Sequence, residues 1–150
     1  MLKVIISALL VIAPMLSDAA IVKGNPNGNI TLSEVFDYQC IHCHRQYSNI
    51  QKIIESNPNL KVRLMPVAIL NQNSLIEATA TIAATQYPDG FDRWNNYALS
   101  GPVLPNEQIS IGLKHMGFDQ KDFVKTMHSH AAEEQLAEGM NLLKDRKSVV

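Results

Sequence analysis

The sequence contains two cysteines, Cys40 and Cys43, in a C-x-x-C spacing. The run before them, Ile30 to Phe36, is apolar and β-prone, and the run after them has helical spacing. A strand that leads a dithiol into the first turn of a helix is a redox arrangement, because the helix end offers unpaired N–H groups and a partial positive charge that stabilise a thiolate. The thiolate, rather than the thiol, attacks disulfides. These residues therefore predict thiol–disulfide chemistry.

Position assigns a role to each side chain of the motif. Cys40, at the exposed helix end, is the predicted nucleophile, and Cys43 is the predicted resolving cysteine because residues three apart share a helix face. His42, as an imidazolium or an N–H donor, is predicted to stabilise the Cys40 thiolate, which favours the reduced form and makes the disulfide an oxidant. Glu34 lies on the strand before the motif, where a buried carboxylate would relay a proton to or from Cys43. The alternative for Glu34 is a strand-edge glutamate in water.

Other kinds of site fit the same residues. C-x-x-C followed by His44 is also the signature of covalent haem attachment, with His44 as one axial ligand and a methionine as the other. The cysteines with His42 and His44 suggest a metal site, which fits tetrahedral zinc poorly because the ligands are so close in sequence, whereas copper(I) needs only two thiolates. A passive bridge or inert thiols are further alternatives, although a disulfide closing so short a loop adds little stability. The favoured interpretation needs no metal and no cofactor.

Length and composition indicate one globular domain behind a leader segment. The chain has 150 residues, of which 46% are hydrophobic and 18% charged. A net charge of −1 without a basic patch argues against a nucleic-acid partner. Lys3, the apolar run 4–16 and the small residues at 17 and 19 predict a signal peptide over residues 1–19, cleaved after Ala19. An uncleaved anchor is the alternative, but the apolar run is short for a membrane span. The sequence thus predicts export to the periplasm or cell envelope, where cysteine pairs oxidise.

The elements expected around the motif are strands and one helix, followed by a helical block. Strands are expected over 21–24, as an edge strand, and over 30–36 and 60–65, the last two parallel with a right-handed connection. A helix is expected from Cys40 to Ser56. This order is typical of a thioredoxin-like α/β domain, here residues 20–150, with a helical insertion at about 70–130.

The helical block is divided by caps and breakers. Its helices are expected from a cap at residue 73 or 74 to 87, over 91–99, from a cap at residue 106, over 119–128 and over 131–147. Glu77 is placed near the first cap, and Gly112 is expected to weaken its helix. Phe123, Val124 and Met127 are expected to be buried.

The segment from Glu34 to Cys43 resembles the active-site segment of the DsbA-like thiol:disulfide oxidoreductases of bacterial envelopes. The histidine before the second cysteine matches, as does the glutamate six residues before the first, whereas Ile41 replaces a proline that many members carry. The run 62–67, with Ser74 and the alanine-rich stretch after it, is similar to the start of the family's insertion. The resemblance implies that the protein donates disulfides to reduced client proteins and that a membrane redox partner reoxidises it.

The resemblance also implies a departure at the C-terminus. Family members continue into a cis-proline loop, two more strands and a last helix, and no proline of this sequence takes the place of that loop. We therefore expect a C-terminally truncated member with an incomplete sheet of two to three strands and impaired oxidase activity. A non-catalytic envelope protein that binds copper or a partner through the same motif is the alternative function.

Overall fold

The computed structural model describes residues 20–145, so the predicted signal peptide lies outside the described residues. These residues form strands and helices in the order expected from the sequence. In chain order the elements are β1 (Ile21–Gly24), β2 (Ile30–Phe36), α1 (Ile41–Ser56), β3 (Leu60–Pro66), α2 (Gln72–Ala84), α3 (Gly90–Leu99), α4 (Asn106–His115), α5 (Gln120–Met127) and α6 (His130–Asp145).

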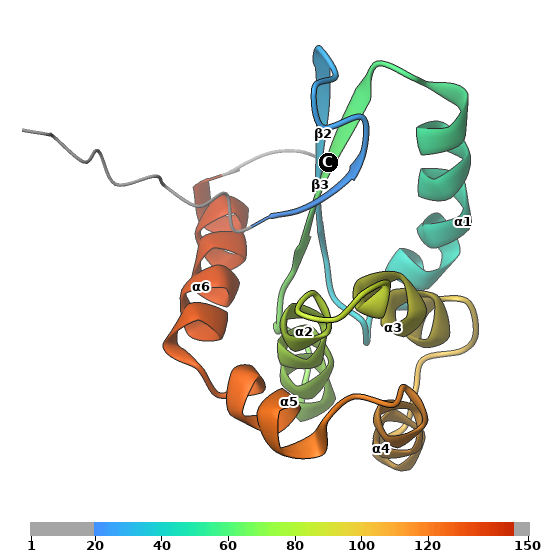
Figure 1. Ribbon diagram of the computed structural model, residues 1–150. Coiled ribbons are helices and arrows are strands. Elements are labelled where there is room, and N and C mark those ends of the chain that lie inside the picture. The colour runs from blue at the N-terminus through green and yellow to red at the C-terminus, as the bar shows by residue number, and fades with distance from the viewer. Residues whose placement is uncertain (1–19, 146–150) are drawn as a thin grey trace, which may run out of the picture.

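The described strands form one three-stranded sheet with the order β1-β3-β2 (Figure 1). β2 and β3 run parallel, with Ile30 opposite Leu60 and Phe36 opposite Pro66, and β1 pairs antiparallel with β3. The central position of β3 follows from its apolar residues, because Leu60, Val62 and Leu64 are all buried. The predicted edge strand, the predicted parallel pair and the predicted α/β sheet of two to three strands are confirmed within residues 20–145.

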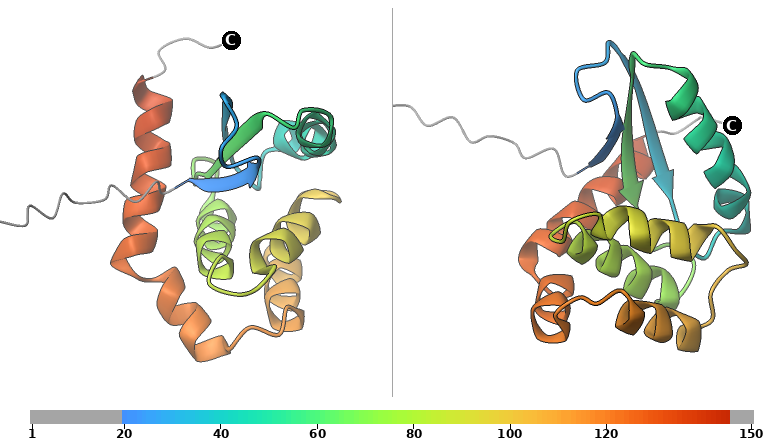
Figure 2. Two further views of the ribbon diagram at one scale, coloured as in Figure 1. Left: turned by 45° about the horizontal axis from the view of Figure 1, so that its top comes forward. Right: turned by 45° about the vertical axis from the view of Figure 1, so that its right-hand side comes forward.

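Helices cover the sheet on both faces and at one end. Figure 2 shows α1 and α6 on opposite sides of the sheet, and α2 to α5 beyond the end to which β2 and β3 point. The backbone of α6 closely approaches the end of β3 at Gly139, where a Cβ atom would lie 3.4 Å from the carbonyl oxygen of Pro66 and 2.9 Å from Cγ1 of the following Val67. Within residues 20–145, no helix is long and apolar enough to cross a membrane.

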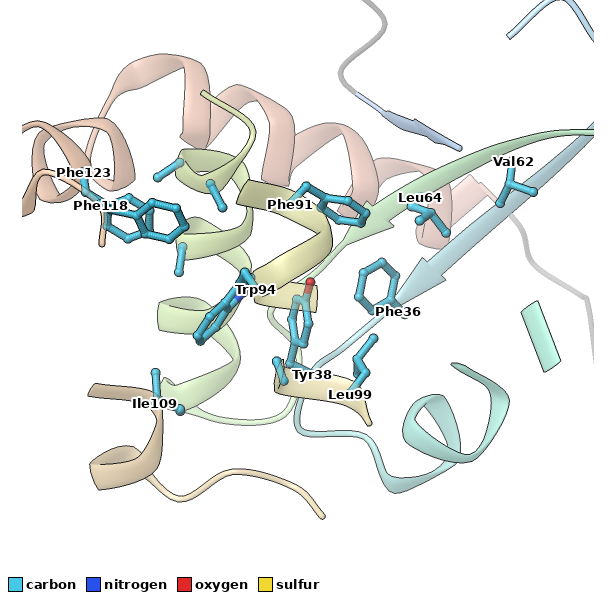
Figure 3. Close-up of a cluster of buried hydrophobic side chains, with 14 of the residues drawn as sticks. Phe36, Tyr38, Val62, Leu64, Phe91, Trp94, Leu99, Ile109, Phe118 and Phe123 are labelled. Carbon is cyan, nitrogen blue, oxygen red and sulfur yellow. The ribbon is translucent and has the colours of Figure 1, made fainter. Parts of the chain in front are cut away.

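The main core lies where the sheet meets the helical layer (Figure 3), and its aromatic rings include two groups in contact: Phe36 with Tyr38 and Trp94, and Phe118 with Phe123. Tyr38 is fully buried between Phe36 and Trp94, with ring centroids 5.1 and 6.3 Å away. The Tyr38 hydroxyl donates to Oδ1 of Asn95 at 2.8 Å, and the indole N–H of Trp94 donates to Oγ1 of Thr81 at 2.9 Å. Because Tyr38 stands two residues before Cys40, this packing fixes the start of the C-x-x-C motif.

Several expected helix boundaries and one core residue were wrong. α2 is capped by Asn71, whose side chain and that of Ser74 form a reciprocal capping box, so the helix starts before the expected cap; it ends at Ala84 rather than Tyr87. In α5, Phe123 is buried but Val124 is 51% exposed, since this short helix buries only one face. The predicted last residues of α6, 146 and 147, lie outside the described residues.

Gly112 has a packing reason that the sequence did not indicate. It is buried in α4, and a Cβ atom there would lie 2.2 Å from the ring of Tyr97 in α3. The Tyr97 hydroxyl donates to the carbonyl oxygen of Gln108 at 2.9 Å. The glycine therefore allows α3 and α4 to pack closely, which offsets its low helix propensity.

Candidate active site

Cys40 is the N-cap residue of α1, at the end of the extended segment that follows β2. Its backbone has φ −92° and ψ 111°, its thiol makes no capping hydrogen bond, and the first turn of α1 contains no acidic residue. The Cys40 N–H donates to the carbonyl oxygen of Asp37 at 3.0 Å, and its own carbonyl accepts from the His44 N–H at 3.2 Å. A half-buried sulfur thus lies at the positive end of a helix, where N–H groups stabilise a thiolate.

Cys43 lies one turn deeper and is held as a thiol. Burial raises its pKa to about 12, with smaller raising contributions from a hydrogen bond to Cys40 and from the charges of Cys40 and Glu34. A hydrogen bond with the backbone of Asp37 acts in the opposite direction. Both cysteines are free thiols in this structure, so it represents the reduced dithiol. Both cysteines are partly buried, but their surroundings differ: Cys40 lies at the N-terminal end of α1, whereas burial favours the protonated form of Cys43.

Glu34 lies in the same pocket as Cys43. The strand β2 turns the Glu34 side chain toward α1, and burial raises the pKa of its carboxyl above the ordinary 4.5. The pocket is lined by Glu34, Phe36, Cys43, Tyr47, Ile50, Gln51, Leu64, Asn95 and Leu99. Of the two alternatives for Glu34, the structure has the partly buried one, and a carboxyl group in this position has the chemistry to exchange a proton with a neighbouring thiol.

The two histidines of the motif lie in different surroundings. His42 is exposed in the first turn of α1. His44 bridges two segments, because its Nε2 lies 2.6 Å from the carbonyl oxygen of Tyr38 and its Nδ1 lies 2.9 Å from that of Gly101. Both ring nitrogens thus face backbone acceptors, and axial ligation of a haem would break at least one of these contacts.

Asp37 holds the turn before the motif, a role that the sequence reasoning missed. Its Oδ1 accepts from the Gln39 N–H at 2.8 Å, and its Oδ2 accepts from the N–H groups of Ile69 and Leu70 at 2.9 and 3.2 Å. The first bond is an Asx turn, which an aspartate two residues before an N–H commonly forms. The other two bonds join the motif to the loop after β3.

Gln39 and Glu77 form a second link that was also missed. The Gln39 Nε2 donates to Oε2 of Glu77 at 2.7 Å and to the carbonyl oxygen of Leu104 at 3.0 Å, and its Oε1 accepts from Nδ2 of Asn71 at 3.2 Å. Glu77 was expected near a helix cap but is fully buried. One signal was present: α2 is rich in alanine and threonine on every side, and a helix without a polar face is typically buried all round.

Among the described residues, no group of three or more His, Cys, Asp or Glu side chains gathers as a metal site would require. Zinc coordination by four side chains of the motif, one of the sequence alternatives, therefore lacks a preformed site in residues 20–145.

The sheet, the dithiol at the start of α1 and the helical layer define a thioredoxin-like fold with a helical insertion. No family model matches the sequence, and no curated protein matches it either. Solved structures do match.

A thioredoxin-like oxidoreductase from Silicibacter pomeroyi is 26% identical, with a TM-score of 0.78 over 85% of this chain and 73% of that one. The thiol-disulfide exchange protein alpha-DsbA2 from Wolbachia pipientis is 23% identical, with a TM-score of 0.75 over 87% of this chain and 72% of that one. A periplasmic thioredoxin-like protein from Salmonella enterica serovar Typhimurium is 18% identical, with a TM-score of 0.65 over 87% of this chain and 75% of that one. The likeness to the Silicibacter pomeroyi protein supports a thioredoxin-like oxidoreductase, and the other two likenesses show the shared fold.

Proposed function

We propose that this protein is an exported thiol:disulfide oxidoreductase that donates the Cys40–Cys43 disulfide to reduced client proteins. The observation that carries the proposal is the asymmetry of the dithiol. Cys40 caps the N-terminus of α1, whereas burial raises the pKa of the neighbouring Cys43 thiol to about 12. Two sulfurs that differ in this way have different tasks, since the one nearer the helix end is the better thiolate and leaving group in exchange.

The proposed reaction moves two electrons from the client to the protein. A client thiolate attacks the Cys40 sulfur of the oxidised protein, which forms a mixed disulfide, breaks the Cys40–Cys43 bond and leaves Cys43 as a thiolate that takes up a proton. The second client thiolate then attacks the client sulfur of the mixed disulfide and releases Cys40. The client dithiol becomes a disulfide, and the protein becomes the reduced dithiol.

Neighbouring side chains supply the proton and the charge for these steps. Glu34 lies in the Cys43 pocket with a raised pKa, so its carboxyl group is the proposed donor to the leaving Cys43 and acceptor in the reverse direction. His42, exposed in the first turn, is the proposed stabiliser of the Cys40 thiolate. A membrane redox partner would accept the electrons and restore the disulfide, and the periplasm is the proposed location because one of the similar structures is a periplasmic protein.

Trapping of the mixed disulfide tests this function. The oxidised protein is mixed with a reduced two-cysteine peptide, and the products are mapped by mass spectrometry. We expect the wild type to convert the two-cysteine peptide to its disulfide, and Cys43→Ser, activated at Cys40 with glutathione, to stay linked through Cys40 to a peptide that carries a single cysteine, because neither partner then has a thiol that resolves the mixed disulfide. Cys40→Ser is the matched control and should transfer nothing. Equal transfer by the two serine variants would contradict the proposed roles.

A further inference from the structure

The Gln39 side chain joins three parts of the molecule next to the nucleophile. It reaches from the residue before Cys40 to Glu77 in α2, to the carbonyl oxygen of Leu104 in the α3–α4 connection, and to Asn71 at the start of α2. The Gln39 amide nitrogen donates two of these hydrogen bonds, and the Gln39 amide oxygen accepts the third. A side chain bonded on all sides has little rotational freedom, so it fixes the backbone that carries it.

Glu77 is the buried end of this link. Its exposed fraction is 0%, its Oε2 accepts the Gln39 amide at 2.7 Å, and its Oε1 has no hydrogen-bond partner among the described residues. A buried carboxyl oxygen without a partner is costly, most of all when it carries charge. The reaction proposed above does not use this carboxyl group.

The surroundings favour the protonated carboxyl. Burial, and then the nearby charge of Asp37, raise the pKa of Glu77 to about 7, although the Gln39 hydrogen bond lowers it. Asp37 comes from the segment before α1, and Tyr38 of the same segment also interacts electrostatically with Glu77. The other helices packed against α2 are α3, α4, α5 and α6. Among the described residues of these four helices, Glu138 is the one charged side chain that is half-buried, and it pairs with Arg63. The other charged side chains of the four helices are exposed, and they include Asp92, Glu107, Lys125 and Glu133.

We propose that Glu77 is a positioning residue of the dithiol site: it holds Gln39 and thereby the Cys40 segment, and the gain or loss of its proton sets how fast the Cys40 sulfur reacts. This proposal deepens the proposed function and rests on it. The physical reason is that ionisation places a second buried negative charge beside the segment that carries Cys40, where Asp37 already lies. A negative charge there disfavours further negative charge on the Cys40 sulfur, so we expect ionisation of Glu77 to slow the reaction of that sulfur.

Alkylation of Cys40 tests the proposal without any client. The reduced protein is treated with iodoacetamide between pH 5.5 and 8.5, and modification of the Cys40 peptide is followed by mass spectrometry. The rate of the wild type is divided by that of Glu77→Gln, which keeps the carbonyl oxygen that accepts from Gln39. We expect a ratio near one at pH 5.5 that falls about three- to tenfold by pH 8.5, with its midpoint near pH 7. Glu55→Gln makes the same chemical change at an exposed carboxylate of α1 and should match the wild type.

A second variant separates positioning from a general effect on folding. Gln39→Leu removes the hydrogen bond that lowers the pKa of Glu77, so the step in the wild-type profile should move to higher pH. Parallel profiles for the wild type and Glu77→Gln would overturn the proposal. If Glu77→Gln does not fold, an unshifted step in Gln39→Leu would overturn it instead. A Glu77-dependent alkylation profile in a protein that oxidises no client would refute the proposed function and leave the positioning role standing.

Discussion

Replacement of Glu77 by glutamine is expected to remove a pH dependence from the free energy of unfolding. Glu77 is fully buried, and burial raises the pKa of its carboxyl from 4.5 to about 7. Between these pH values the folded protein keeps a proton that the unfolded chain has lost, so stability falls as pH rises. The contribution is complete below pH 4.5 and is lost as the pH passes about 7. Since one pKa unit corresponds to about 1.36 kcal/mol, the loss is on the order of 3 kcal/mol.

Urea denaturation followed by tryptophan fluorescence measures this loss, because the chain has one tryptophan, the buried Trp94. The wild type and Glu77→Gln are compared at several pH values between 4.5 and 8. As the pH rises across this range, the unfolding free energy of the wild type should fall by about 3 kcal/mol relative to that of Glu77→Gln. Other titrating groups contribute equally to both proteins, so their contributions cancel when the two free energies are subtracted. Glu55→Gln should follow the wild type. A constant difference between the wild type and Glu77→Gln would refute the assignment of a proton to the buried carboxyl.

Three further substitutions test the site and its supports. Glu34→Gln should slow protonation of the leaving Cys43, and hence reduction of the protein disulfide by glutathione, by about tenfold or more in stopped-flow fluorescence; an unchanged rate would remove Glu34 from the mechanism. Asn71→Ala should lower the unfolding free energy in urea by about 1 kcal/mol, because α2 loses its N-cap, whereas Asn71→Ser should retain most of it; equal losses would argue against the cap. Gly112→Ala should cost about 1–3 kcal/mol in thermal unfolding, since the new Cβ would lie 2.2 Å from a tyrosine ring of α3. Gly101→Ala, with no atom within 4 Å of its Cβ, is the neutral control, and a loss equal to that of Gly112→Ala would refute the packing argument.

The local features of the site could be predicted from the sequence. The C-x-x-C spacing and the helical period behind it indicated that Cys40 starts a helix and that Cys43 lies one turn deeper, as the structure places them. The alternation of β2 put Glu34 on one face with apolar neighbours but left open whether it is buried, and the parallel pairing of β2 with β3 followed from the helical crossover between them. In each case the residues that determine the feature lie within one helix or strand, or in two elements that follow each other in the sequence.

The links that hold the site could not be predicted, because their partners are distant in sequence. Asp37 bonds the backbone of Ile69 and Leu70, and Gln39 bonds Glu77 and Leu104. Periodicity reports which face of a helix is apolar, but not which segment will cover a polar residue on that face. Glu77 was placed near a cap for this reason, although the helices that pack on α2 leave it no exposed surface.

Equilibration with glutathione tests the central claim most directly, because it asks which sulfur exchanges first. The protein is incubated over a series of reduced-to-oxidised glutathione ratios, quenched with acid and mapped by mass spectrometry. We predict that the wild type shifts between the dithiol and a Cys40–Cys43 disulfide as one two-electron couple, and that Cys43→Ser accumulates glutathione on Cys40. Thiols that stay reduced at every ratio, or glutathione on Cys43 ahead of Cys40, would contradict the account.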